Sequence, residues 1–223
     1  MHYVFQFGIV FDNLPRLFHG ALLTIEMSAT AMALGLTLAV LLALLRTVGP
    51  RPIEWPIRAY IEVIRNTPFL IQLFIIYFSL PAIGVRMDAG EAAVIGMAIN
   101  LAAYAAEILR AGIEAIPRGQ IEAGHALGLK RILIFRFVIL VPALRIVYPA
   151  LSSQFILLML GSSVVSTISA VELTAITNTL QSTTFRAFEF YFAATAIYLA
   201  MALMFRFVLD GLGVLAFGRW QAG

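Results

Sequence analysis

Amide and hydroxyl side chains inside otherwise apolar stretches are the residues best suited to bind a small polar molecule. They lie in the third and fourth apolar stretches of the sequence, where charged residues are few. Such groups form hydrogen bonds without the high cost of placing a charge inside a bilayer. They also bond often to a neighbouring helix or to their own backbone, so both roles stay open. The candidate polar path consists of Asn100, Gln154, Ser162, Ser163 and Ser166.

A second candidate is the polar stretch 117–142, which is bracketed by Pro117 and Pro142. Residues 120–127 suit one or two helical turns, and Gly128 suits a left-handed C-terminal cap. Residues 130–141 suit a second helix. The stretch therefore predicts a helix–turn–helix elbow between two apolar stretches.

The expected exposed face of this elbow has small side chains at Ala123, Gly124 and Ala126, so a partner surface can approach closely. Glu122 is available there for a charge-assisted contact. A docking element and a solvated loop between spans are the two interpretations that these residues support.

Several kinds of chemistry are excluded by the sequence. A phosphate-binding P-loop needs G-x-x-x-x-G-K-[ST], and the only lysine, Lys130, follows Leu129 and precedes Arg131. The chain has no cysteine, and its three histidines form neither an H-E-x-x-H motif nor a cluster. Serine is frequent but lacks a histidine and acid pattern. We therefore expect no enzyme and no cofactor in this chain.

Composition points to a membrane protein. The 223 residues are 61% hydrophobic and 12% charged, whereas soluble domains carry about 25% charged residues. We expect an all-α membrane protein with a single transmembrane domain over 1–223. Its five predicted spans cover residues 20–45, 67–80, 91–109, 147–169 and 190–215.

Small residues indicate how these spans pack. Ala31, Gly35, Ala39 and Ala43 recur every four positions in the first span, which places them on one helix face. The third span is rich in alanine and glycine, so we expect it inside the bundle. The second span is short, which predicts that it begins in the preceding helix and bends near Pro68.

Orientation is predicted from the basic residues. Of the 15 lysines and arginines, only Arg16, Arg86 and Arg186 fall on the side opposite the elbow. The positive-inside rule therefore predicts an external N-terminus and a cytoplasmic C-terminus and elbow. The cytoplasmic set comprises positions 46, 51, 58, 65, 110, 118, 130, 131, 136, 145, 206 and 219.

The elbow resembles the EAA signature of binding-protein-dependent ABC importer permeases. That pattern is E-A-A, three residues, G, about nine residues and then I-x-L-P, and here Glu122-Ala123-Gly124, Gly128 and Ile139-Leu140-Val141-Pro142 stand in it. Nearly the whole chain resembles the polar amino acid uptake branch of that family. Further matching segments include His19-Gly20 with Thr24 and Glu26, Arg65-Asn66-Thr67-Pro68, Gln72-Leu73, Ala103-Tyr104-Ala105-Ala106-Glu107-Ile108, Gly112-Ile113, Val165-Ser166 and Val171-Glu172-Leu173.

The resemblance implies a type I importer permease in a bacterial cytoplasmic (inner) membrane. Such a subunit has five transmembrane helices, pairs with a second permease subunit, and receives an amino acid from an extracytoplasmic solute-binding protein. The elbow would be a coupling helix docked on a cytoplasmic ABC ATPase dimer, which holds the ATP and Mg. Membrane lipid is the remaining partner, and no nucleic acid is expected. The coupling role carries over to Glu122, Ala123, Gly124 and Gly128, with Arg118 and His125 as neighbours.

The sequence departs from the family pattern in the fourth span. Family members often show Lys-Asp/Asn-Thr-Ser where this chain has Leu160-Gly161-Ser162-Ser163. The missing charged pair is compatible with one half of a heterodimer, and a homodimer stays open. An ion-coupled secondary carrier, a non-transporting adaptor, and an importer of an amino-acid-like metabolite such as an opine are the alternatives. A carrier usually has ten or more spans, so five count against it.

Overall fold

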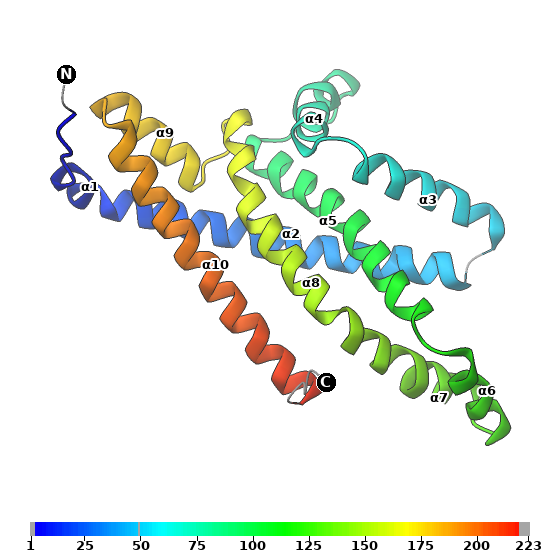
Figure 1. The fold of residues 1–223 in the computed structure, drawn as a ribbon. Coiled ribbons are helices and arrows are strands. Elements are labelled where there is room, and N and C mark those ends of the chain that lie inside the picture. Colours follow the sequence, from blue (N-terminus) through cyan, green and yellow to red (C-terminus); the bar gives the residue numbers. More distant parts are fainter. Residues whose placement is uncertain (1–2, 49, 219–223) are drawn as a thin grey trace.

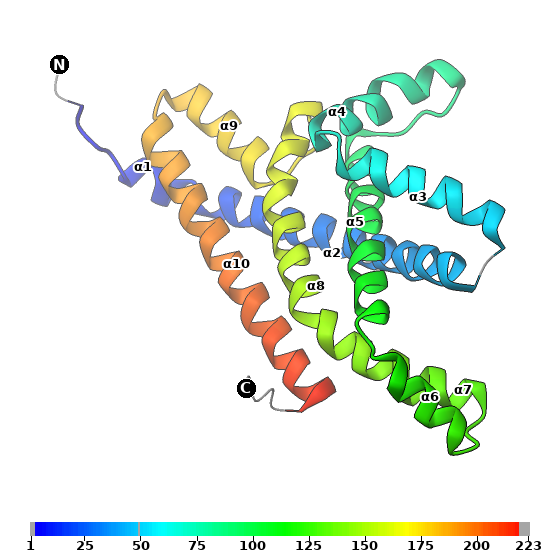
Figure 2. The same cartoon turned by 45° about the vertical axis from the view of Figure 1, so that its right-hand side comes forward.

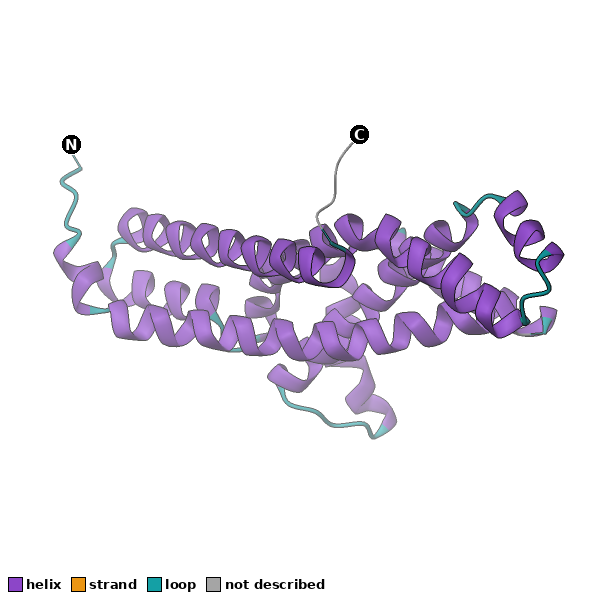
Figure 3. Ribbon diagram, turned by 90° about the horizontal axis from the view of Figure 1, so that it is seen from below, coloured by secondary structure: helices purple, strands orange, loops and turns teal. Residues whose placement is uncertain are grey.

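The computed structural model describes residues 3–48 and 50–218, and over these ranges the chain is helical with no strand (Figure 3). Arg219, used above for orientation, lies outside the described residues. Four helices are long and apolar enough to cross a membrane, and a bent pair makes five if it counts as one span. This confirms the predicted all-α membrane fold.

The long helices form the body of the molecule (Figures 1 and 2). Helices α2, α5 and α10 are longer than the ranges that hydropathy alone predicted, because they continue past the apolar windows, whereas α8 begins earlier and ends earlier than its predicted range. Their bounds are Leu14–Val48 for α2, Ala89–Glu114 for α5, Val141–Gly161 for α8 and Ala187–Phe217 for α10. The short helices are α1 (Gly8–Asp12), α6 (Arg118–Ala126), α7 (Arg131–Leu133) and α9 (Leu173–Thr184).

The second span is a broken helix. Helix α3 (Arg51–Arg65) ends before Pro68, and α4 (Phe69–Phe74) starts after it. The ring and missing N–H of Pro68 prevent α3 from continuing through this position. Pro68 itself has an extended backbone. Helix α4 continues through a π turn and a 3₁₀ turn to Ile83. The span is bent by 110° between its first half, Pro52–Arg65, and its second half, Phe69–Ile83. The predicted bend near Pro68 is therefore confirmed.

The stripe of small residues packs α2 against α5. Ala31, Gly35 and Ala39 are buried on this face. A Cβ atom at Gly35 would lie 2.8 Å from the carbonyl oxygen of Ala98 and 3.0 Å from the Cβ of Leu101. Small residues thus let the two helices approach closely, as the spacing predicted.

Charged residues join the same two helices near the elbow. Arg46 of α2 lies 3.0 Å from Glu107 of α5, and Glu107 also accepts a 3.0 Å hydrogen bond from Nε of Arg110. Glu114 pairs with Arg110 from the next turn. Glu107 therefore ties the end of α5 that leads into the elbow to α2, and Arg110 links Glu107 to Glu114 along α5.

The second helix of the elbow does not end at Pro142. It continues as one helix from Arg131 to Ile168. Pro142 has no N–H to donate to the preceding turn. That turn is the π turn Ile134–Leu140, whose hydrogen bonds have a wider spacing than those of an α-helix. The second half of the elbow is therefore the start of the fourth span. The last turn of that span, Ser162–Ile168, is a 3₁₀ helix.

Helix α9, at the end of the molecule far from the elbow, was not predicted, because its sequence is hydroxyl-rich and has no apolar period. Glu172 caps it by accepting from the N–H groups of Thr174 and Ala175 at 2.9 and 2.8 Å. Tyr198 of α10 donates to the same carboxyl group at 2.6 Å. Burial raises the pKa of the Glu172 carboxyl group, and these hydrogen bonds oppose that rise.

Candidate polar pocket and docking elbow

A polar pocket of about 280 Å³ lies where the broken span meets α5 and α8. It brings together Asn100 of α5 and Gln154 of α8, two residues of the predicted polar path. The complete lining is Thr67, Phe69, Asn100, Tyr104, Gln154, Leu157, Leu158 and Gly161.

The three predicted serines do not line this pocket. Each lies in the 3₁₀ turn beyond Gly161 and donates its hydroxyl proton to the carbonyl three residues earlier. The bonds run from Ser162 to Met159 at 2.7 Å, from Ser163 to Leu160 at 2.9 Å and from Ser166 to Ser163 at 2.8 Å. Ser162 is also fully buried. These hydroxyls therefore support their own backbone, the alternative that the sequence left open.

The pocket lining carries no carboxylate, ammonium or guanidinium group among the described residues. A cation lies just beyond one wall, since the Arg65 guanidinium carbon sits 5.5 Å from the centre of the Tyr104 ring. The Tyr104 hydroxyl donates to the carbonyl of Arg65 at 3.5 Å. The arrangement suits a small polar molecule held by hydrogen bonds.

Thr67, Tyr104 and Gly161 were not predicted as pocket residues. Thr67 belongs to the break itself, and the Thr67-Pro68 pair was interpreted as a bend signal and as part of the family resemblance, not as a pocket residue. Tyr104 follows Asn100 by one helical turn on the same face, so the helical period was the signal that identifies it. Gly161 contributes open space: a Cβ atom there would meet nothing within 4 Å.

The elbow has the predicted turn. Gly128 has a φ of +72°, its N–H donates to His125 O at 3.0 Å, and Leu129 N–H donates to Gly124 O at 3.1 Å. This pair of bonds is the Schellman arrangement, which closes a helix with a left-handed residue. The cap predicted at Gly128 is therefore confirmed.

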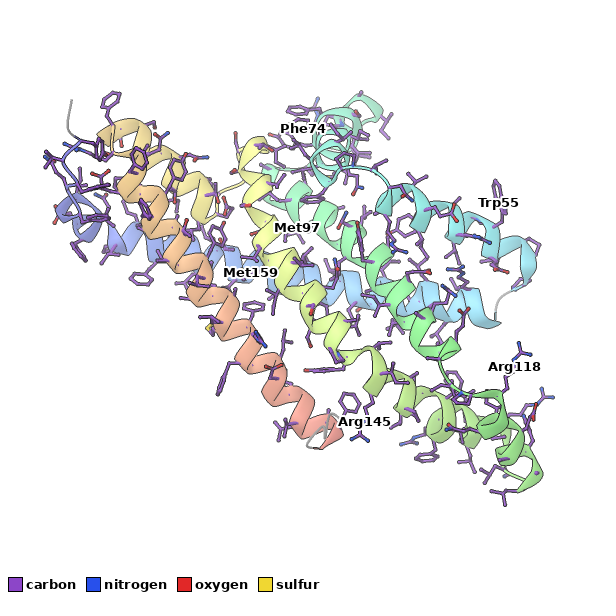
Figure 4. All side chains as sticks on the ribbon, viewed as in Figure 1. Trp55, Phe74, Met97, Arg118, Arg145 and Met159 are labelled. Carbon is purple, nitrogen blue, oxygen red and sulfur yellow. The ribbon has the colours of Figure 1, made fainter. Side chains whose placement is uncertain are left out.

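The face of α6 differs from the prediction at one position. Glu122 and Ala123 are exposed as expected, and the neighbouring Arg118 and His125 are exposed as well. Figure 4 shows the Arg118 side chain extending away from the elbow. Gly124 is instead buried. A Cβ atom there would lie 3.1 Å from Cγ1 of Ile134, so glycine lets α6 pack on the following π turn. The prediction that Gly124 belongs to the exposed small face is wrong.

Leu127 adds an apolar group to that face. Its side chain is 79% exposed at the end of α6, next to the exposed Ala126. The exposed surface of α6 thus combines small, charged and apolar groups, a mixture that suits contact with another protein better than contact with water alone.

Comparison with known proteins places the chain in a family. The family model described as a binding-protein-dependent transport system inner membrane component matches residues 32–214. The octopine transport system permease protein OccM of Rhizobium meliloti is 38% identical over 201 residues, covering 86% of this chain and 82% of that protein. The glutamine transport system permease protein GlnP of Escherichia coli (strain K12) is 37% identical and covers 92% and 94%.

Solved structures agree. A chain in a crystal structure of an amino acid ABC transporter with histidines superposes with a TM-score of 0.88 at 36% identity, covering 95% of this chain and 99% of that chain. A chain of the MetNI methionine ABC transporter has the same fold at 20% identity, with a TM-score of 0.77 and coverage of 92% and 98%. This chain is therefore a member of the family of inner membrane components of binding-protein-dependent transport systems.

Proposed function

We propose that this chain is the permease subunit of an ATP-binding-cassette importer that carries a polar amino acid into the cytoplasm. The observation that carries the proposal is the uncharged pocket lined in part by polar side chains from the broken span, α5 and α8. Relatives named as glutamine and octopine permeases support the substrate class. Because its relatives are binding-protein-dependent transporters, an ion-coupled carrier is disfavoured.

The energy would come from a separate ATPase dimer that holds ATP and Mg, and a solute-binding protein would deliver the amino acid. A second permease subunit, identical or different, would complete the transmembrane unit. The N-terminus would lie outside and the elbow in the cytoplasm. ATP binding would bring the ATPases together and move the two docked elbows, so that the pocket opens outward; this requires each ligand to prefer one of the two states.

An opine is the second substrate candidate, favoured by the 38% identity to an octopine permease. An opine carries a second carboxylate, and the described pocket lining offers no cation to pair with it. A polar amino acid with an uncharged side chain fits this lining better, because a buried unpaired charge is costly.

Substrate protection of a single cysteine tests the pocket. The chain has no cysteine, so Gly161→Cys introduces one reactive thiol where a Cβ atom has open space. We expect a methanethiosulfonate reagent to label this variant, and L-glutamine to slow the labelling. Gly8→Cys on α1 is the matched control, because its Cβ atom is also unobstructed but lies outside the pocket and outside the elbow.

Labelling of Gly8→Cys should not respond to L-glutamine. If none of L-glutamine, L-cystine, octopine and the other common L-amino acids protects Gly161→Cys in the complex, the pocket is not the substrate site. Protection by octopine alone would move the assignment to the second candidate.

Charge reversal on the elbow tests ATPase docking. Glu122 is exposed on α6 and has no ion-pair partner among the described residues. We expect Glu122→Arg to lower recovery of the ATPase with the purified permease by about tenfold, the effect of losing one charge-assisted contact. Glu54→Arg on α3 makes the same charge change on an exposed residue away from the elbow and should leave recovery unchanged. Equal recovery from both variants would remove Glu122 from the docking surface.

A further inference from the structure

The break in the second span leaves backbone carbonyls without helical partners. Helix α3 ends at Arg65, so the carbonyls of Ile64 and Thr67 face the bend instead of another turn of helix. Inside a membrane such groups need partners from the protein, since lipid offers none. The side chain of Thr67 meets one such need by donating to Val63 O at 2.7 Å.

Gln72 of α4 provides hydrogen bonds to the carbonyls of Ile64 and Thr67. Its amide nitrogen Nε2 lies 2.8 Å from Ile64 O, 3.1 Å from Thr67 O and 2.8 Å from Oγ1 of Thr67. Its amide oxygen Oε1 accepts from Nδ2 of Asn100 at 3.0 Å. Gln72 is only 8% exposed, so these contacts replace contacts with water. One side chain therefore joins α3, α4 and α5.

This chain of contacts fixes the polarity of both amides. A backbone carbonyl only accepts, so the atom of Gln72 that faces Ile64 and Thr67 must be the nitrogen. The oxygen of Gln72 then faces Asn100, and the atom of Asn100 that meets it must be Nδ2. Exchange of N and O in either amide would set like groups against each other.

The result is a defined hydrogen-bonding group at the pocket. Asn100 lines the pocket, its Nδ2 is engaged by Gln72, and its Oδ1 has no hydrogen-bond partner among the described residues. The same part of α5 is held against α3, because the hydroxyl of Tyr60 donates to Ile99 O at 2.6 Å. Asn100 therefore offers the pocket an oriented acceptor on a fixed stretch of helix.

We propose that Gln72 is a positioning residue: by satisfying the broken helix, it forces Asn100 to present its amide oxygen to a hydrogen-bond donor of the substrate. This inference rests on the proposed function and deepens it. The donor is an ammonium or amide N–H group, both of which an amino acid such as glutamine carries. A site built to accept such a bond discriminates against molecules that lack the donor, because its acceptor then stays unpaired.

The test uses the permease–ATPase complex with the Gly161→Cys reporter, and measures the L-glutamine concentration that halves the labelling rate. Gln72→Met keeps the side-chain length but releases Asn100, so we expect this concentration to rise about tenfold, the effect of one well-placed hydrogen bond. In this buried position Gln72→Glu is a neutral carboxylic acid, which donates its O–H to the broken helix and still accepts from Nδ2 of Asn100. The concentration should therefore stay within about threefold of the parent, although the complex becomes less heat-stable because one donor is lost. A merely structural role predicts the reverse order, with the buried carboxyl group the more damaging change.

Asn100→Ala separates the two residues further. If Gln72 acts through Asn100, then Gln72→Met adds no further loss of protection in the Asn100→Ala background. Unchanged half-protection in Gln72→Met, or additive losses in the double variant, would overturn the inference while leaving the pocket assignment intact. If Gln72→Met yields no folded complex, a tenfold or greater loss in Gln72→Glu overturns it. Absence of protection in the parent reporter would instead overturn the proposed function.

Discussion

Replacing Gly128 with valine is expected to reduce uptake at least about tenfold, whereas replacing it with asparagine should preserve most of the activity. Gly128 has a φ of +72°, and a Cβ atom there would meet nothing within 4 Å. The difference between the two variants therefore arises from the backbone and not from a clash inside the chain. A left-handed conformation costs an ordinary residue about 1–2 kcal/mol, most for β-branched side chains, whereas asparagine tolerates it.

A Cβ atom at this position is unobstructed in both variants, so the pair tests the left-handed turn and not the space around it. The strained turn would release the bonds from the Gly128 and Leu129 N–H groups that close α6. Uptake of radiolabelled L-glutamine and ATPase turnover should be measured together. Loss of coupling lowers uptake while the ATPase stays bound to the permease or hydrolyses ATP without transport. Equal uptake by the two variants would show that the left-handed cap has no part in coupling.

The sequence predicted those features of the fold that depend on local chemistry. The left-handed cap at Gly128 follows from one residue type at a helix end, and the break at Pro68 follows from a missing N–H. The small-residue face of α2 follows from a four-residue period. Each of these signals lies within a few residues along the chain, so no knowledge of distant contacts was needed.

The features that the sequence did not predict depend on contacts between distant segments. Gly124 was placed on the exposed face of α6 because its neighbours are small, but the position of Ile134, ten residues later, turns it inward. Gln72 and Asn100 are 28 residues apart, and nothing local indicates that one amide orients the other. Helix α9 depends on Tyr198 and on Thr24, whose hydroxyl oxygen accepts from Leu173 N–H at 3.1 Å.

The candidate site shows the same division. Asn100 and Gln154 were identified because amides are rare in apolar spans, and the structure brings them to one pocket. Ser162, Ser163 and Ser166 were chosen by the same rule, but their hydroxyls donate to carbonyls of their own turn, whereas the Asn100 amide donates to Gln72 of another helix. Residue type alone therefore does not decide whether a polar side chain in this bundle reaches another helix or bonds to its own backbone.

The close contact between α2 and α5 gives the largest expected effect on folding. Gly35→Leu is expected to prevent recovery of folded permease from the membrane, and Gly35→Ala to lower its free energy of unfolding by about 1–3 kcal/mol. The reason is that the first added atom would lie 2.8 Å from the carbonyl oxygen of Ala98, a backbone atom that moves only if the helices separate. Separation would also loosen the contacts of Ala31 and Ala39, which are fully buried on the same face.

Gly211→Leu on α10 is the matched control, because a Cβ atom at Gly211 meets nothing within 4 Å and leucine favours helix more than glycine does. The fraction of permease that stays monodisperse on size-exclusion chromatography after heating measures the effect. The monodisperse fraction of Gly35→Ala should fall at a lower temperature than that of the parent, whereas the monodisperse fraction of Gly211→Leu should not. If Gly35→Leu were as heat-resistant as Gly211→Leu, close approach would not be what holds α2 and α5 together. The position of α2 would then depend on the Arg46–Glu107 ion pair and on its contacts with α9.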